Sequence, residues 1–233
     1  MKLEWHRKIK DLLDTAIYIK DIKGEDFLSI SSLIEDISKV YEDFYQYDEK
    51  FIENFITQVE NRLKFIIDEG EKTLTPYEIV KITRHPQRFT LQDILENVYD
   101  SYMELGGEGE LNIDPAMVCA KATIVRKVGN DLYFHQVMVI GHEKGHGEDF
   151  RQGGSAKPWG NEKAFRYMKM AETEGIPIHF FIFTPGAYPI EDYPGSTQQI
   201  ARNLYCMAKL KVPTVAFISE GGSGGAEAIG LAD

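Results

Sequence analysis

The chain of 233 residues has only two cysteines, Cys119 and Cys206. Two thiols are too few for a disulfide framework or for a four-cysteine zinc site. Each stands in an apolar run, so we expect both to be buried and chemically inert. The sequence therefore predicts neither a cross-linked scaffold nor a thiolate metal centre.

Long apolar runs and an excess of positive charge are also missing. No stretch approaches the roughly 18 consecutive apolar residues that a membrane-spanning helix needs. The N-terminal segment has neither the apolar core of a signal peptide nor the composition of a transit peptide, so a cytoplasmic location is expected. Acidic residues outnumber basic ones by 37 to 26, which gives a formal net charge of -11. A surface of this sign repels a phosphate backbone, and we expect neither a membrane nor a nucleic acid as partner.

The first part of the chain has the pattern of a helical region. Hydrophobic residues make up 43% of the sequence, enough for one sizeable core with a smaller helical appendage. Apolar positions recur at helical spacing over residues 3–69. Thr75, Pro76 and Glu78 form a helix start with a capping box. Thr90 with Asp93 predicts another helix, running over residues 91–107. We therefore expect a helical N-terminal region over residues 1–110.

The periodicity changes after Pro115. Two short apolar runs, 117–125 and 132–140, are joined by Gly-Asn-Asp and predict a pair of strands. A helix over 162–174, a strand over 176–183, a helix over 197–211 and a strand over 212–219 are expected to follow. Alternating strands and helices indicate right-handed parallel crossovers. Residues 111–233 are therefore expected to form an α/β domain.

Residues 142–146, His-Glu-Lys-Gly-His, match the H-E-x-x-H pattern of zinc metalloproteases. That pattern binds zinc when one helix carries both histidines on the same face. Here Gly141, Gly145 and Gly147 crowd the segment and an apolar strand precedes it, which disfavours such a helix. We expect no metal site in this chain. Lys144 is either a solvated loop residue or a group that steers a carboxylate or phosphate.

Residues 221–225, Gly-Gly-Ser-Gly-Gly, match the G-x-S-x-G nucleophile elbow of α/β-hydrolases and follow a predicted strand. That fold places its acid and its histidine after the serine, but no histidine follows Ser223. The hydrolase triad in that order is therefore excluded. A triad with an upstream histidine such as His142 stays open, because geometry and not chain order defines a triad.

A further interpretation of the glycine run uses its backbone. Glycines between a strand and a helix allow a sharp turn and leave N–H groups unhindered, where they can stabilise a developing negative charge. Residues 184–189, Thr-Pro-Gly-Ala-Tyr-Pro, form a second turn at a strand end. If both strands are parallel, the two turns line one cleft. Two tight turns without chemistry are the alternative.

Five motifs together resemble the α subunit of bacterial acetyl-CoA carboxylase carboxyltransferase. They occur in the order of that family and cover residues 70–233 well, whereas the N-terminal region is similar only loosely. The motifs are Arg-His-Pro-Gln-Arg at 84–88, Gly-His-Glu-Lys-Gly at 141–145, Thr-Pro-Gly-Ala-Tyr-Pro at 184–189, Ile-Ala-Arg-Asn-Leu at 200–204 and Glu-Gly-Gly-Ser-Gly-Gly-Ala at 220–226.

The resemblance implies both a fold and an activity. The fold would be crotonase-like, an α/β structure of stacked strand–strand–helix turns that is incomplete at its C-terminal end, with the helices of residues 1–110 packing against a partner subunit. The activity would be transfer of a carboxyl group from carboxybiotin to acetyl-CoA, giving malonyl-CoA, the first committed step of fatty acid biosynthesis. The implied partners are a β subunit with a zinc ribbon, biotin carboxylase, and the biotin carboxyl carrier protein, which bears the biotin.

The resemblance also implies a site. The backbone N–H groups of Gly221 and Gly222 would hold the biotin oxygen as the catalytic oxyanion site. The substrate-binding surface would be formed by Gly186, Ala187, Gly224 and Gly225. Gly222→Val is expected to crowd the oxyanion position and abolish transfer with little loss of folding. The alternatives are another crotonase-type acyl-CoA carboxylase or decarboxylase component, and a noncatalytic assembly subunit of the same fold.

Overall fold

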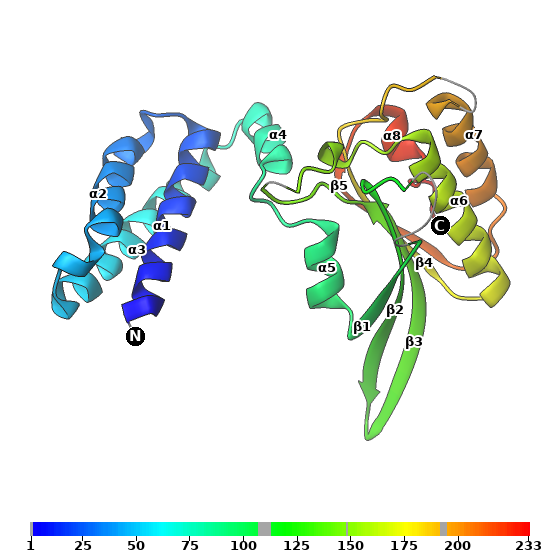
Figure 1. Cartoon of the computed structure of the whole chain (residues 1–233), viewed down its shortest axis with the longest axis horizontal. Coiled ribbons are helices and arrows are strands. Elements are labelled where there is room, and N and C mark those ends of the chain that lie inside the picture. Colours follow the sequence, from blue (N-terminus) through cyan, green and yellow to red (C-terminus); the bar gives the residue numbers. More distant parts are fainter. Residues whose placement is uncertain (1, 107–112, 148, 192–194) are drawn as a thin grey trace. The chain divides into compact units, whose positions relative to one another are not determined.

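The computed structural model describes residues 2–106, 113–147, 149–191 and 195–233. They form two compact units, Met1–Gln87 and Arg88–Asp233, which Figure 1 shows in sequence colours. The boundary expected between residues 110 and 111 lies outside the described residues. The units divide earlier, after Gln87, because Leu91 and Leu95 pack with the sheet of the second unit. No helix in the described part of the chain is long and apolar enough to cross a membrane.

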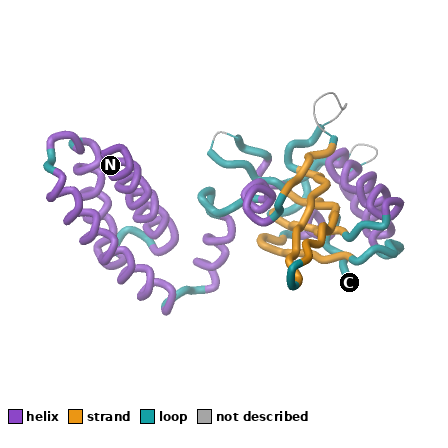
Figure 2. The backbone as a smooth tube through the Cα atoms, turned by 90° about the horizontal axis from the view of Figure 1, so that it is seen from below, coloured by secondary structure: helices purple, strands orange, loops and turns teal. Residues whose placement is uncertain are grey.

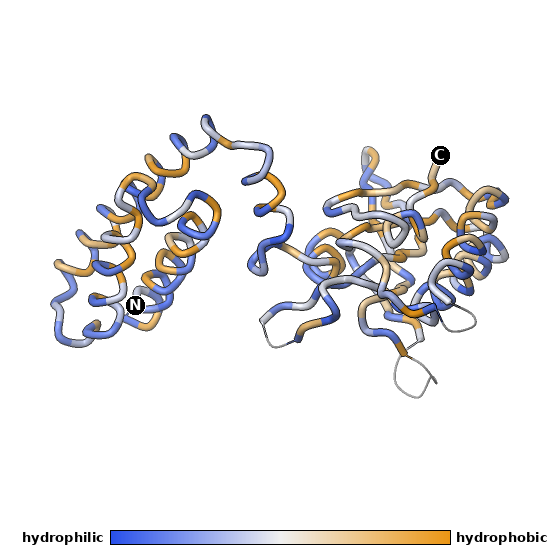
Figure 3. The backbone as a smooth tube through the Cα atoms, turned by 90° about the horizontal axis from the view of Figure 1, so that it is seen from above, coloured by the Kyte–Doolittle hydropathy of each residue, from blue (hydrophilic) through white to orange (hydrophobic). Residues whose placement is uncertain are grey.

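The first unit is helical, as the sequence predicts. Its apolar core is formed by side chains that recur every three or four positions along each helix. Ile9, Ile37 and Ile56, each from a different helix, belong to this core. Figure 3 shows apolar and polar residues alternating along these helices. Its elements are α1 (Lys2–Lys23), α2 (Ile30–Glu42), α3 (Glu49–Lys72) and α4 (Pro76–Arg84), with short 3-10 turns at Phe27–Ser29 and Phe44–Gln46.

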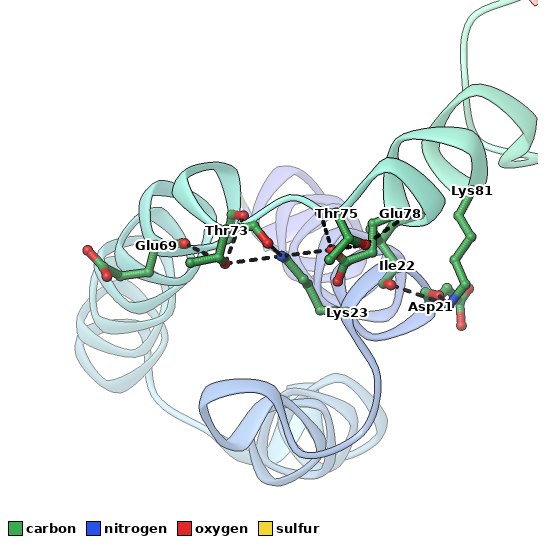
Figure 4. Close-up of polar contacts among 9 residues, drawn as sticks. Asp21, Ile22, Lys23, Glu69, Thr73, Thr75, Glu78 and Lys81 are labelled. Carbon is green, nitrogen blue, oxygen red and sulfur yellow. Dashed lines mark hydrogen bonds and ion pairs between the residues drawn. The ribbon is translucent and has the colours of Figure 1, made fainter.

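Lys23, the last residue of α1, joins three helices of this unit. Its Nζ atom donates to the carbonyl oxygen of Thr73 at 3.0 Å and to Oε2 of Glu78 at 3.3 Å. Glu78 is also the carboxylate of the predicted capping box of α4. Lys81 donates in turn to the carbonyl oxygen of Asp21 in α1 at 3.1 Å (Figure 4). These contacts fix the start of α4 against the ends of α1 and α3.

Lys23→Met is expected to destabilise the helical unit, because the Lys23 side chain is only 6% exposed and its bonds are not replaced by water. A lost bond from a charged donor costs about 1.5–3 kcal/mol, and each kcal/mol lowers the Tm of a unit of this size by roughly 4–8 °C. Thermal unfolding followed by circular dichroism measures the change. Lys20→Met is the control, since the Lys20 and Glu25 side chains are 34% and 77% exposed and ion pairs that water reaches contribute little. Equal Tm changes in the two variants would contradict the assigned role of Lys23.

The second unit is built on one mixed sheet of the order β1-β2-β3-β4-β5. Strands β1 to β3 pair antiparallel, and β3, β4 and β5 pair parallel. Successive side chains of each strand point to opposite faces of the sheet. Helices pack on both faces, as Figure 2 shows. The elements are α5 (Leu91–Val98), β1 (Ser101–Leu105), β2 (Met117–Val128), β3 (Asp131–His142), α6 (Pro158–Glu174), β4 (Ile178–Thr184), α7 (Ser196–Met207), β5 (Thr214–Gly221) and α8 (Ser223–Glu227), with a 3-10 turn at Gln152–Gly154.

Two apolar clusters hold the helices to this sheet. Met117, Cys119 and Ile140 face α6 and α7, whereas Val118 and Val139 face α5. Cys119 and Cys206 are both buried, as expected, and neither forms a disulfide bond. The mixed α/β fold with a helical N-terminal region is confirmed, and β2, β3 and α6 form one strand–strand–helix turn.

The helix expected over residues 91–107 is wrong in its second half. The capping box at Thr90 forms and the helix begins at Leu91, but it ends at Val98. Residues 101–105 are strand β1 and pair with β2 from Ser101 opposite Thr123 to Leu105 opposite Cys119. Pairing with an apolar strand distant in sequence overrides the local helical spacing.

Candidate active site

The carboxyl ends of β4 and β5 lie side by side, because Thr184 at the end of one pairs with Gly221 at the end of the other. The chain leaves β4 through Pro185, Gly186 and Ala187, and it leaves β5 through the glycine run into α8. The two turns identified in the sequence are therefore neighbours at one edge of the sheet.

Glycine is required at two points where these turns touch. A Cβ atom on Gly222 would lie 1.8 Å from the carbonyl oxygen of Pro185. One on Gly225 would lie 2.4 Å from the backbone nitrogen of Ala187 and from the carbonyl carbon of Gly186. Cβ contacts below 3.0 Å are essentially never observed. The two turns therefore pack backbone against backbone, at a distance that no side chain allows.

The rest of the glycine run leaves backbone accessible. Gly221 is exposed, and Gly222 and Gly224 are half-buried. A Cβ on Gly221 would find its nearest atom in the Ile218 side chain at 3.1 Å, and one on Gly224 would lie 3.4 Å from the Ile200 side chain. Accessible main chain therefore occurs at residues 221 and 222, the two positions that the family resemblance predicts as an oxyanion site.

The turn after β4 is held by its own hydroxyl group. The Oγ1 atom of Thr184 donates to the carbonyl oxygen of Gly186 at 2.7 Å and accepts from the Gly186 N–H at 3.1 Å. Further on, the N–H of Tyr188 donates to the carbonyl oxygen of Ala156 at 3.2 Å. Since the Gly186 N–H is used within the turn, Gly186 and Ala187 can form a wall of the site rather than an anion-binding group.

An ion pair lies directly beside the glycine run. The Nζ atom of Lys144 is 2.5 Å from Oε2 of Glu220, and the two side chains are 17% and 5% exposed. Lys144 is thus not a solvated loop residue, which corrects that expectation, and the carboxylate that it binds here is that of Glu220. The sequence did not predict Glu220 as a site residue. The signal that could have indicated it is its position, a carboxylate between an apolar strand and a run of glycines.

The His-Glu-Lys-Gly-His segment does not form a helix, as the sequence predicts. His142 ends β3 and is fully buried, and neither of its ring nitrogens has a hydrogen-bond partner among the described residues. Burial lowers the pKa of His142 to about 3. His146 instead contacts Oδ2 of Asp93 at 2.8 Å. The described residues contain no cluster of three metal-ligating side chains, and Ser223 is not paired with His142.

The sequence of the chain decides its family. Residues 25–233 match the family model described as acetyl co-enzyme A carboxylase carboxyltransferase-like. The chain belongs to this family. It is 36% identical over 205 residues to the acetyl-coenzyme A carboxylase carboxyl transferase subunit alpha of Campylobacter jejuni, covering 85% of this chain and 63% of that one. It is 40% identical over 166 residues to the subunit of the same name from Aromatoleum aromaticum, covering 69% and 49%.

The chain spans about half to just under two thirds of the length of these carboxyltransferase relatives. Among solved structures, the β subunit of Pseudomonas aeruginosa geranyl-CoA carboxylase matches 67% of this chain and 28% of its own, with 19% identity and a TM-score of 0.46. Transcarboxylase 12S matches 58% and 25%, with 17% identity and a TM-score of 0.44. The family's five motifs in this chain include both turns that meet at the ends of β4 and β5.

Proposed function

We propose that this chain is the α-type subunit of a biotin-dependent acetyl-CoA carboxyltransferase, a transferase that moves a carboxyl group from carboxybiotin to acetyl-CoA and forms malonyl-CoA. The observation that supports it is the backbone-to-backbone packing of two turns at the ends of β4 and β5. That packing occurs in a chain of the carboxyltransferase family. The product is the precursor for fatty acid synthesis, and we place the enzyme in the cytoplasm.

The glycine run has the chemistry that an oxyanion site needs. Main-chain N–H groups fixed by surrounding structure stabilise negative charge without reorganising during the reaction. Residues 221–225 contain only one polar side chain, that of Ser223, and the neighbouring Glu220 is bound to Lys144. The turn is therefore suited to binding through its backbone and not to general-base catalysis by a side chain.

Biotin is implied by the family. The exposed main chain of the glycine run fits a biotin that is carried on another protein and reaches the turn from solvent. When bound, carboxybiotin supplies the carboxyl group, and its ureido oxygen gains negative charge when that group leaves. The N–H groups of Gly221 and Gly222 would donate hydrogen bonds to this oxygen. Gly186, Ala187, Gly224 and Gly225 would limit the space beside it. The biotin itself would be attached to a carrier protein and not to this chain.

The proposed partners are a zinc-ribbon β subunit, the biotin carboxyl carrier protein and biotin carboxylase. The β subunit would supply the coenzyme A side of the site, because this chain offers one oxyanion turn and the reaction needs a second for the thioester enolate. The helical unit would contact a partner subunit. Exposed apolar side chains on its α3 and α4, including Phe65, Tyr77 and Ile79, support such a contact.

Reconstitution tests the proposal. The chain is co-expressed with a carboxyltransferase β subunit, and biotinylated carrier, biotin carboxylase, ATP, bicarbonate and acetyl-CoA are added. Malonyl-CoA formation above that of the β subunit alone is the expected result. A second chain, extended by the segment that the Campylobacter jejuni relative has in addition, is tested in parallel. If only the extended chain gives malonyl-CoA, the missing segment and not a different function explains the inactivity of the short chain.

The alternatives give different results in the same experiment. Another acyl-CoA carboxylase or decarboxylase component would act on a different acyl-CoA, or would release CO₂ from malonyl-CoA without biotin. A noncatalytic assembly subunit would co-purify with the β subunit and would give no turnover in either the short or the extended chain. Either outcome would replace the proposal.

A further inference from the structure

The last residues of β5 contain an irregularity next to the glycine run. Ile182 of β4 pairs with Ile218, but the next residue, Phe183, pairs with Glu220. Ser219 is therefore an extra residue, a β-bulge, in strand β5. A bulge turns the following side chains toward the other face of the sheet, and bulges of this kind often lie beside active sites. Here the bulge places Glu220 opposite Phe183, on the face of the sheet that carries Phe181 and Phe183, and Glu220 is buried there.

Two side chains from other parts of the second unit bind the bulged segment. Nη1 of Arg88, at the start of the second unit, donates to the carbonyl oxygen of Ser219 at 3.3 Å. Lys144, in the loop after β3, donates to the Glu220 carboxylate at 2.5 Å. The ion pair thus spans from the end of β3 to the end of β5, across the intervening strand β4.

The path of the Lys144 side chain is confined. A Cβ atom on Gly154 would lie 1.9 Å from the carbonyl oxygen of Phe183 and 3.3 Å from Cγ of Lys144. Gly154 therefore lets the 3-10 turn of residues 152–154 pack against both the end of β4 and the Lys144 side chain. The lysine is enclosed on its way to Glu220, and the loop after β3 is tied to the segment that leads into Gly221.

We propose that Lys144 and Glu220 are positioning residues for the oxyanion turn, an assignment that rests on the proposed function of that turn. The bulge at Ser219 places Glu220 opposite Phe183, and the partly buried Lys144 side chain holds its carboxylate there. Gly221 and Gly222 follow directly, so the pair fixes the direction in which their N–H groups leave the sheet. Neither side chain contacts substrate in this assignment.

Removing one partner of a buried pair leaves the other charged group without compensation. Lys144→Met keeps the length of the side chain and removes its charge, and we expect it to release the bulged segment. Amide hydrogen exchange of residues 219–225 should become at least about tenfold faster, which corresponds to local opening rather than global unfolding. In a reconstituted enzyme, kcat should fall about 100-fold, the cost of a displacement of about 1 Å in a catalytic group, while KM for acetyl-CoA should change little.

The test compares four variants of the full chain by hydrogen exchange with mass spectrometry and by steady-state kinetics. Glu220→Gln should reproduce the effects of Lys144→Met, and the double variant should be no worse than either single one, because the pair acts as a unit. Lys121→Met is the matched control, since it breaks the Lys121–Glu174 pair (2.6 Å) elsewhere in the same unit. It should leave exchange of residues 219–225 and kcat unchanged.

Unchanged exchange at residues 219–225 in a folded Lys144→Met chain would overturn the proposal, as would equal acceleration throughout the second unit or additive effects in the double variant. The exchange measurement needs no activity. If Lys144→Met shows the localised exchange effect but the wild-type chain gives no carboxyl transfer in either length, the proposed function fails while the pair still holds the turn. If transfer is present and the exchange effect is absent, only the positioning role fails.

Discussion

Gly222→Ala is expected to separate the two turns of the site, to abolish carboxyl transfer and to destabilise the sheet unit. The added methyl group would lie 1.8 Å from the carbonyl oxygen and 2.2 Å from the carbonyl carbon of Pro185. These are backbone atoms of the residue that directly follows β4, so they cannot rotate away as a side chain would. Overpacking of this kind costs about 1–3 kcal/mol or more. Gly222→Val, expected from the sequence to spare folding, should therefore destabilise the unit even more than alanine does.

Two other glycines of the run separate the consequences of this clash. Gly224→Ala is the matched control for folding, because its Cβ would lie 3.4 Å from the Ile200 side chain, an ordinary contact. Gly221→Ala places a methyl group on exposed main chain, 3.1 Å from Cγ2 of the exposed Ile218 side chain, which can yield by a few tenths of an ångström, and the variant should reduce transfer with little change in Tm. Tm and malonyl-CoA formation are measured for each variant. A Gly222→Ala chain with wild-type Tm and transfer would refute both the packing argument and the site.

Local sequence patterns predicted the elements that carry the site. The capping boxes at Thr75 and Thr90 are defined within four residues, and the strands before Thr184 and Gly221 are short apolar runs bounded by turn residues. Such signals depend on neighbours in sequence, so they can be read without the fold. The meeting of the two turns followed from one additional rule, that parallel strands bring their carboxyl ends to the same edge.

The features that the sequence did not predict depend on register or on distant contacts. Strand β1 was taken for helix because its pairing partners, such as Thr123, lie about twenty residues away. The bulge at Ser219 is a shift of one residue between β4 and β5, which no composition signal marks. The Lys144–Glu220 pair joins residues 76 positions apart. The same bulge brings the pair together, so missing one meant missing the other.

Acid is expected to destabilise the second unit through His142. Burial lowers the pKa of His142 to about 3 from an ordinary value of 6.5. The unfolded chain therefore binds one more proton than the folded chain between these two values. Above pH 6.5 both states are neutral at this residue and it has no effect on stability. As pH falls from 6.5 toward 3, the free energy of unfolding decreases by about 1.4 kcal/mol for each pH unit.

His142→Leu is expected to remove this dependence. The side chain lies on the face of β3 that also carries Met138 and Ile140, and neither ring nitrogen has a hydrogen-bond partner among the described residues. An apolar side chain of similar size therefore leaves no donor or acceptor of its own unsatisfied, so stability at pH 7 should be kept or raised. Below pH 6 the variant should be more stable than the parent chain, by an amount that grows as pH falls.

Denaturant unfolding between pH 4.5 and 7.5, followed by tryptophan fluorescence and circular dichroism, gives the free energy of unfolding of both chains. His135→Leu serves as the control, because His135 lies on the same strand but is exposed, and it should leave the difference between pH 7 and pH 5 unaltered. A His142→Leu chain that keeps the full acid sensitivity of the parent would show that the proton is taken up elsewhere. If the slope falls by about one proton in His142→Leu alone, the buried imidazole is the group that limits the acid stability of the sheet unit.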